Sequence, residues 1–165
     1  MGLALLACLV SGAALAAGQQ APGARRTLPT LLAIEPRAAA EPVAAGQRFQ
    51  VTLDLTPAPG IHVYAPEVRN YRPIALTLKT DGGVRLLEAP RYPAAESYYY
   101  APLQETVPVY QKPFRITQDV SLDGAKPGST VTIAGVLSYQ ACDARLCYPP
   151  RTSAVTWNVR ISEAP

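Results

Sequence analysis

The sequence predicts an all-β protein, an immunoglobulin-like antiparallel β-sandwich formed by a single domain. Its 17 prolines and 9 tyrosines favour strands joined by many turns over a helical bundle. About seven segments carry strand patterns and are separated by turn signals, which is typical of a sandwich. We find no segment with the 3.6-residue periodicity of an amphipathic helix.

Composition and charge agree with one globular domain. Apolar residues make up 48% of the 165 residues and charged residues 16%, so the chain can build a core and is not a disordered one. The net charge of +3 is modest, and Arg25 and Arg26 form the only adjacent basic pair. Without a basic stripe, the composition indicates no nucleic-acid partner.

Alternation of apolar and polar residues identifies the strands. Residues 49–57 alternate strictly, with Phe49, Val51, Leu53 and Leu55 on one face. Two later segments do the same: residues 130–141, with Val131, Ile133, Gly135, Leu137 and Tyr139 on one face, and residues 153–162, with Val155, Trp157, Val159 and Ile161. Less regular patterns predict strands over 61–66, 74–80, 84–90 and 114–122. Because the Cys…Trp…Cys spacing of antibody domains is missing, the likeness to them is one of architecture.

Residues 91–106 break the strand pattern. The segment holds two prolines and three successive tyrosines, Tyr98, Tyr99 and Tyr100. We predict a long loop here, and long loops in compact domains are often functional.

The N-terminus indicates export. Residues 1–16 form an apolar run that ends in Ala14-Leu15-Ala16, and we interpret it as a secretory signal peptide, although a positively charged first region is missing. A membrane anchor and a lipoprotein signal around Cys8 are the alternatives. Residues 17–30 read as a flexible leader and residues 31–162 as the sandwich domain. No later segment is long and apolar enough to span a membrane, so we expect a periplasmic or secreted protein without a stable span after cleavage.

The segment SYQACDARLCYPP, residues 138–150, holds the other two cysteines, Cys142 and Cys147. An oxidising compartment would allow them to form a disulfide. A closed zinc site needs three or four ligands, and the mature chain offers two cysteines and one histidine, His62, so we do not expect such a site. A structural staple and a redox centre remain as alternatives. A structural disulfide that closes so short a loop contributes roughly 2 kcal/mol to the stability of the fold, on the loop-entropy estimate. Nearby prolines limit how the sulfurs relax, which favours the redox reading, while the charges of Arg145 and Asp143 oppose each other.

The motif YQACDARLCYPP resembles the active-site segment of the N-terminal periplasmic domain of the thiol:disulfide interchange protein DsbD, in which Tyr-Gln-x-Cys is followed by a short insert and Cys-Tyr-Pro-Pro. The segments GIHVYAP and VPVY add to the likeness, which covers roughly residues 31–161. The insert between the cysteines looks one residue shorter than in the best-known members. The resemblance implies an immunoglobulin-like domain with a reversible Cys142–Cys147 pair and no cofactor, in which Cys147 forms the mixed disulfides.

The resemblance also implies partners and supporting residues. The family passes electrons from the membrane part of DsbD to periplasmic thioredoxin-like proteins, so we expect such partners and a DsbD-like membrane electron donor, unless the domain has been reused. Tyr64 matches a tyrosine near the family's active site, and His62 stands where another tyrosine is expected; the alternative for His62 is an exposed strand residue. Tyr98, Tyr99 and Tyr100 fall in the region of a cap loop that shields the disulfide, the alternative being ordinary packing.

Overall fold

The structure is a computed structural model that describes residues 30–163, so the predicted signal peptide and nearly all of the predicted leader lie outside it. Strands dominate the described chain, and a single 3₁₀ turn joins two of them. The elements are β1 (Leu32–Arg37), β2 (Phe49–Pro57), β3 (His62–Tyr64), β4 (Ala75–Leu78), β5 (Val84–Leu86), β6 (Glu96–Tyr100), η1 (Ala101–Leu103), β7 (Glu105–Tyr110), β8 (Phe114–Leu122), β9 (Thr130–Tyr139), β10 (Ala141–Cys142) and β11 (Arg151–Arg160).

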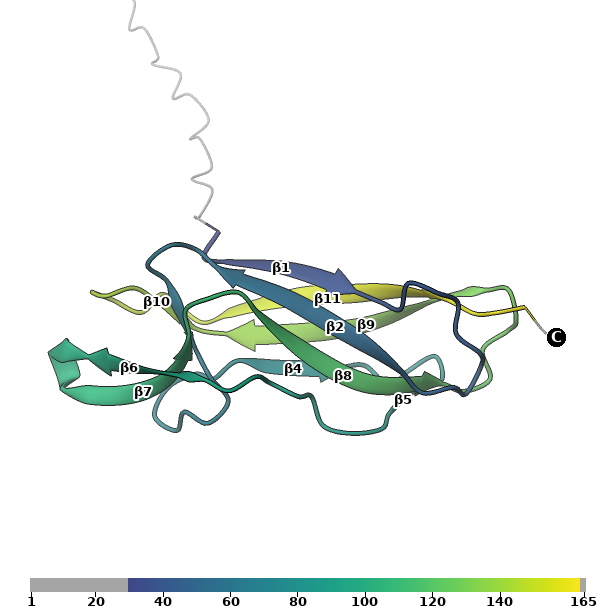
Figure 1. The fold of residues 1–165 in the computed structure, drawn as a ribbon, viewed down its shortest axis with the longest axis horizontal. Helices are drawn as coiled ribbons and strands as arrows, with labels where there is room; N and C mark the ends of the chain where they lie inside the picture. The colour runs from purple at the N-terminus through teal and green to yellow at the C-terminus, as the bar shows by residue number, and fades with distance from the viewer. Residues whose placement is uncertain (1–29, 164–165) are drawn as a thin grey trace, which may run out of the picture.

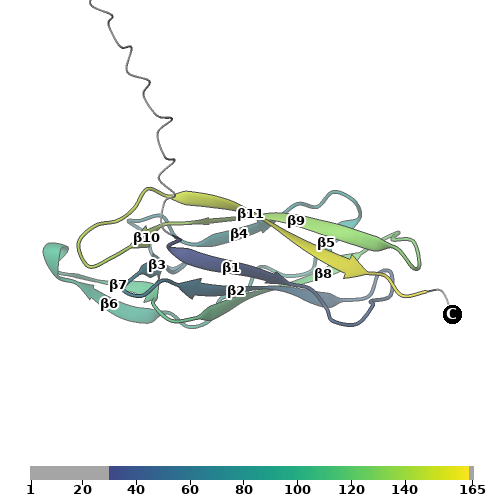
Figure 2. The same cartoon turned by 90° about the horizontal axis from the view of Figure 1, so that it is seen from above.

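Two antiparallel sheets form the sandwich. One has the order β1-β2-β8-β5 and the other β11-β9-β4. Figures 1 and 2 show the sheets as two layers, with β1, β2 and β8 on one side and β4, β9 and β11 on the other. The predicted all-β, immunoglobulin-like sandwich is therefore confirmed, and it follows from alternating strands that each bury one face.

The core lies between these layers and uses the faces that alternation predicts. Leu53 on β2, Leu137 on β9 and Trp157 on β11 are all buried. The Trp157 indole N–H donates to the carbonyl oxygen of Thr52 on β2 at 2.8 Å and so links the two sheets. A Cβ at Gly135 would lie 3.2 Å from the Trp157 ring and 3.0 Å from a strand carbonyl oxygen, which explains the glycine in the middle of β9.

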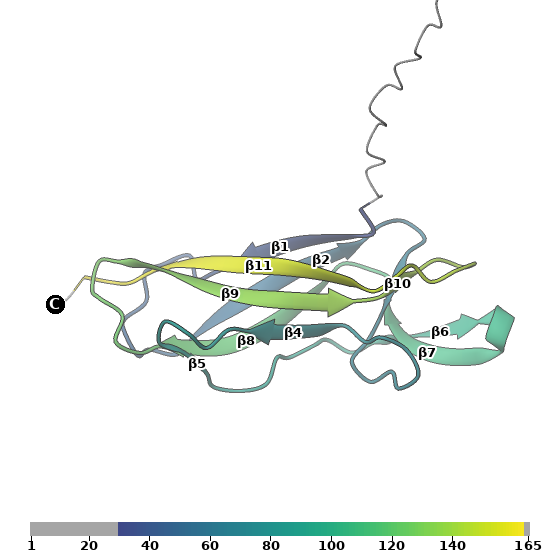
Figure 3. The ribbon, with the colours of Figure 1, turned by 180° about the vertical axis from the view of Figure 1, so that it is seen from behind.

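A third, smaller sheet extends one end of the sandwich. Its order is β10-β3-β7-β6, and β6 pairs with β7 through a register that sets Tyr98 opposite Val107. We call residues 96–110 the tyrosine hairpin. Figures 1 and 3 show it projecting beyond the sandwich at the end where β10 also lies. The first cysteine and the three tyrosines belong to this one sheet, because Cys142 lies in β10 and the tyrosines lie in β6.

The predicted loop over residues 91–106 is therefore wrong for most of its length. Residues 96–100 form a strand, η1 turns the chain, and β7 begins at Glu105. Pro102 is the second residue of the 3₁₀ turn, where its missing N–H costs little. Gln104 adopts the left-handed conformation that closes the tip, with φ of 52°. The prolines suggested a loop, but Pro93 precedes the hairpin and Pro102 lies in its 3₁₀ turn, a position that a hairpin tolerates.

Candidate functional site

Cys142 and Cys147 form a disulfide at the edge of the small sheet. Cys142 ends β10 and pairs across strands with His62 of β3. The chain then turns back, and the sulfur of Cys147 bonds that of Cys142, with the two Cα atoms 4.0 Å apart. Cys142 is only 1% exposed, whereas Cys147 is partly exposed. Cys147 is therefore the cysteine that an incoming thiol can approach from solvent.

Asp143 organises the loop between the cysteines. Its Oδ1 accepts hydrogen bonds from the backbone N–H groups of Arg145 and Leu146 at 2.7 and 2.9 Å. Its Oδ2 accepts one from the Tyr148 hydroxyl at 3.0 Å. These bonds, led by the one from the Arg145 amide, hold the pKa of the Asp143 carboxyl below its usual value. The carboxylate therefore fixes the loop conformation, a role that the comparison of its charge with that of Arg145 did not reveal.

Tyr64 lies against the disulfide. Its hydroxyl oxygen is 3.4 Å from the sulfur of Cys147, and the side chain is buried. Burial, followed by the negative charge of Glu105, raises the pKa of Tyr64 to about 12. The phenol therefore stays protonated at any physiological pH and can donate to a sulfur that gains negative charge.

His62 is buried beside both the disulfide and the tyrosine hairpin, so the alternative of an exposed strand residue is wrong. Its ring centroid lies 4.3 Å from that of Tyr98 and 5.8 Å, edge-on, from that of Tyr64. Burial lowers the pKa of His62, against a smaller opposing effect of the Asp143 charge. The imidazole therefore stays neutral to lower pH than a free histidine and packs as an aromatic ring.

The three tyrosines of β6 differ in position. Tyr98 is half-buried and packs on the cluster that Cys142 forms with Tyr64, Val107 and Val109. Tyr99 is 61% exposed, and Tyr100 is partly buried. Alternate side chains of a strand point to opposite faces, so Tyr99 points away from the face that Tyr98 presents to the site. The structure brings Tyr98 to the disulfide and leaves Tyr99 outside.

Tyr71 and Glu105, which the sequence did not single out, complete the surroundings of the disulfide. The Tyr71 ring stacks on the Tyr64 ring, with centroids 4.4 Å apart and an interplanar angle of 16°. The Tyr71 hydroxyl donates a hydrogen bond to the carboxylate of Glu105 at the start of β7. Tyr71 comes from the loop between β3 and β4, and no local pattern in that loop indicates where its ring lies. Asp143 had a signal, because aspartate often accepts hydrogen bonds from amides two or three residues on.

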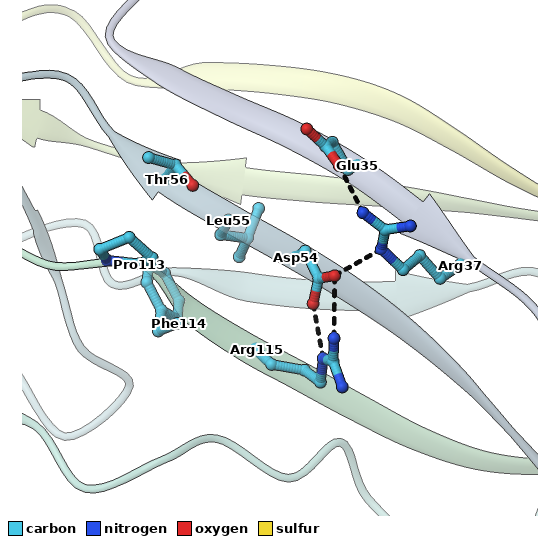
Figure 4. Close-up of a pocket in the computed structure, with 8 residues that line it drawn as sticks. All are labelled: Glu35, Arg37, Asp54, Leu55, Thr56, Pro113, Phe114 and Arg115. Carbon is cyan, nitrogen blue, oxygen red and sulfur yellow. Dashed lines mark hydrogen bonds and ion pairs between the residues drawn. The ribbon is translucent and has the colours of Figure 1, made fainter.

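A hollow elsewhere on the surface carries no comparable chemistry. It has a volume of about 540 Å³ and lies over β1, β2 and the start of β8 (Figure 4). The Asp54 carboxylate at its centre is held by Arg115 at 2.5 Å and Arg37 at 2.6 Å, and Arg37 also contacts Glu35. These charged groups satisfy one another, so they leave no unpaired charge for a ligand. Within residues 30–163 there is also no group of three or more side chains that could hold a metal ion.

Comparison with protein families agrees with this geometry. The family model described as the N-terminal part of the thiol:disulfide interchange protein DsbD matches residues 30–158. The chain belongs to this family. The match contains the whole cysteine loop. The Cys142–Cys147 disulfide therefore lies within the part of the chain that matches this thiol:disulfide interchange family. No curated protein matches the chain as a relative. The part of the DsbD N-terminal domain that the structure describes has no helix long and apolar enough to cross a membrane.

Proposed function

We propose that this DsbD N-terminal domain relays electrons in the periplasm through a reversible Cys142–Cys147 disulfide. A DsbD-like membrane reductase supplies the electrons, and thioredoxin-like proteins receive them. Family membership supports the exchange chemistry. The observation that carries the proposal is the unequal exposure of the two cysteine residues, with Cys142 buried and Cys147 partly exposed at the end of the domain.

The exchange takes place in two balanced halves. In the first, a thiolate of the reduced donor attacks Cys147, the Cys142–Cys147 bond breaks, and Cys142 leaves as a thiolate and takes up a proton. The second donor thiol then attacks the mixed disulfide, so the donor is oxidised and this domain holds two thiols. In the second half, Cys147 attacks the disulfide of the acceptor, and Cys142 resolves the new mixed disulfide. Two electrons have then passed from donor to acceptor.

The residues around the disulfide have distinct roles in this scheme. Tyr64 donates a hydrogen bond to the Cys147 thiolate, since its hydroxyl already faces that sulfur. His62 and Tyr98 cover the sulfurs with aromatic rings and limit access to them. Organic cofactors and metals play no part in the scheme, because thiolates carry the electrons.

Trapping of the mixed disulfide tests the proposal. Cys142→Ala removes the resolving thiol, so this variant should accumulate covalent complexes with thioredoxin-like proteins on non-reducing gels, and reductant should release them. Cys147→Ala is the matched control and should trap far less. If neither variant captures such a partner at native expression, the relay fails.

Reduction of the purified protein separates the relay from the alternative, a secreted protein-binding sandwich with an inert disulfide. Mild reductant should expose two thiols while the β-type circular dichroism persists, because the disulfide closes a short loop outside the main core and contributes about 2 kcal/mol. A reduction potential below roughly −300 mV, or loss of the fold on reduction, would favour the inert disulfide.

A further inference from the structure

A closed ring of contacts joins the two cysteines to the tyrosine hairpin. On one side, Cys142 pairs with His62 across the strands, and the His62 ring contacts the Tyr98 ring of the hairpin. On the other side, the sulfur of Cys147 lies 3.4 Å from the Tyr64 hydroxyl. Cys142 is therefore connected to the hairpin through its backbone pairing with His62, and Cys147 contacts the Tyr64 side chain on the other side.

Tyr71 closes the second side of this ring. Its ring stacks on Tyr64, and its hydroxyl donates to Glu105, which sits in β7 opposite Tyr100 of β6. A bond from a neutral hydroxyl to a carboxylate is charge-assisted and stronger than one between neutral groups. It thus fixes the hairpin near its tip, four residue pairs beyond the last pairing of β7 with β3, which joins Tyr64 to Val109.

The hairpin needs such an attachment because its outer part has little other support. Strand β6 lies at the edge of the small sheet and pairs there with β7. Beyond it, η1 is fully exposed, with Leu103 at 61% exposure. Segments with few buried contacts open at low free energy, so side-chain contacts such as those of Tyr98 and Glu105 decide how closely the hairpin lies on the disulfide.

We propose that Tyr71 is a positioning residue of the disulfide site, which holds the tyrosine hairpin and Tyr64 against Cys147 through its ring stack and its hydrogen bond to Glu105. This inference rests on the proposed function, since it concerns access of a thiol to the same disulfide. Loss of the Tyr71 hydroxyl frees the hairpin near Glu105, and Tyr98 moves with it. Cys147 then becomes more open to attack.

Tyr71→Phe tests this role because it keeps the ring stack and removes only the hydroxyl. Glu105→Ala removes the acceptor, whereas Glu105→Gln keeps an acceptor oxygen without the charge and should rescue the contact in part. Tyr110→Phe is the matched control. The Tyr110 ring is also stacked, on that of Phe114, and its hydroxyl also donates a hydrogen bond, to the Pro93 carbonyl oxygen at 2.8 Å. Tyr110 lies at the base of the hairpin, outside the ring of contacts. Thermal melting of every variant measures any general loss of stability.

The rate at which dithiothreitol reduces the oxidised protein is the main readout. Tyr71→Phe and Glu105→Ala should accelerate reduction by about tenfold, the lower end of the scale of one hydrogen bond to a charged group. Glu105→Gln keeps the acceptor without its charge, so its rate should fall between those of the wild type and Glu105→Ala. Tyr110→Phe should leave the rate unchanged even where it lowers the melting temperature. Hydrogen exchange should become faster over residues 96–107 in Tyr71→Phe.

Two results would overturn the inference: an unchanged reduction rate and hydrogen exchange in Tyr71→Phe, or equal acceleration in Tyr110→Phe. Either leaves the relay standing if the wild-type disulfide is reversible. If the wild-type disulfide resists reduction, the relay fails instead. Hydrogen exchange in Tyr71→Phe then decides by itself whether Tyr71 holds the hairpin.

Discussion

The carboxylate of Asp143 accepts a hydrogen bond from the hydroxyl of Tyr148 at 3.0 Å, so the residue after the first cysteine is tied to the residue after the second. The same side chain also accepts from two amides of the loop. The loop is therefore held in its conformation by a side chain as well as by the disulfide.

Asp143→Ala should loosen the cysteine loop. It removes the acceptor for the amides of Arg145 and Leu146, so their hydrogen exchange should become faster, and the melting temperature should fall by about 2–4 °C. Asp143→Asn keeps a carbonyl oxygen in place and should restore most of the protection. Equal exchange at both amides in wild type and Asp143→Ala would contradict this role.

Acid should weaken the sandwich through Asp54. Its hydrogen bond from Arg115, and then the one from Arg37, lowers its pKa to about 2 (Figure 4). A carboxyl whose pKa is lower in the folded than in the unfolded protein contributes stability above its unfolded pKa, and loses it as the pH falls through the folded value. This contribution is thus complete at pH 7 and disappears between about pH 4 and pH 2.

Asp54→Asn should therefore melt a few degrees below the wild type at pH 7 and together with it near pH 2. Arg115→Gln should reproduce most of this difference, because its hydrogen bond is the largest cause of the lowered pKa. Melting curves recorded by circular dichroism between pH 2 and pH 7 test this. A gap between Asp54→Asn and wild type that does not depend on pH would show that packing is responsible and that charge is not.

Shielding of the disulfide should depend on Tyr98 and not on Tyr99. Tyr98 contacts His62 and packs on the cluster with Cys142, whereas Tyr99 points to solvent. Tyr98→Ala should therefore speed reduction by a small thiol several-fold, and Tyr99→Ala should leave the rate unchanged. If Tyr99→Ala is reduced faster than Tyr98→Ala, the face of the hairpin that carries Tyr98 does not shield the disulfide.

Strict alternation allowed much of the fold to be predicted. The segment 49–57 became β2 with the predicted bounds, because every second residue is apolar and one face meets the core. The segment 114–122 also has its predicted bounds, as β8. Strand β1 was not predicted, since it pairs at the edge of the first sheet and buries little beyond Leu32. Its stability comes from pairing with β2, a long-range contact that a local pattern does not report.

The candidate site was likewise predictable from the sequence only in part. The cysteine motif and its resemblance to a family pointed to Cys142, Cys147, Tyr64 and His62, and the structure brings all four together. Tyr71 could not be found from sequence, because its contact with Tyr64 depends on how the loop between β3 and β4 folds back. The tyrosine hairpin could not be predicted either, because the pairing of β6 with β7 overrides the local signal of its prolines.

Tyr64→Phe should raise the pKa of the Cys147 thiol in the reduced protein. The Tyr64 hydroxyl faces that sulfur, and because its own pKa is about 12 it remains a donor over the whole range in which a thiol titrates. A donor that favours the charged form lowers the pKa of its partner, so its loss leaves less thiolate at neutral pH. Alkylation of Cys147 by iodoacetamide at pH 7 should then slow by roughly three- to tenfold, because the thiolate is the nucleophile.

The pH dependence of that alkylation separates this effect from a change in access. If the hydroxyl stabilises the thiolate, the alkylation rates of wild type and Tyr64→Phe should converge as the pH rises and the thiol ionises in both. A gap that persists at high pH would instead mean that the substitution changes access to the sulfur. Tyr110→Phe removes a hydroxyl from another buried tyrosine and should leave the whole profile unchanged. Matching profiles in Tyr64→Phe and wild type would leave Tyr64 as a packing residue beside the disulfide.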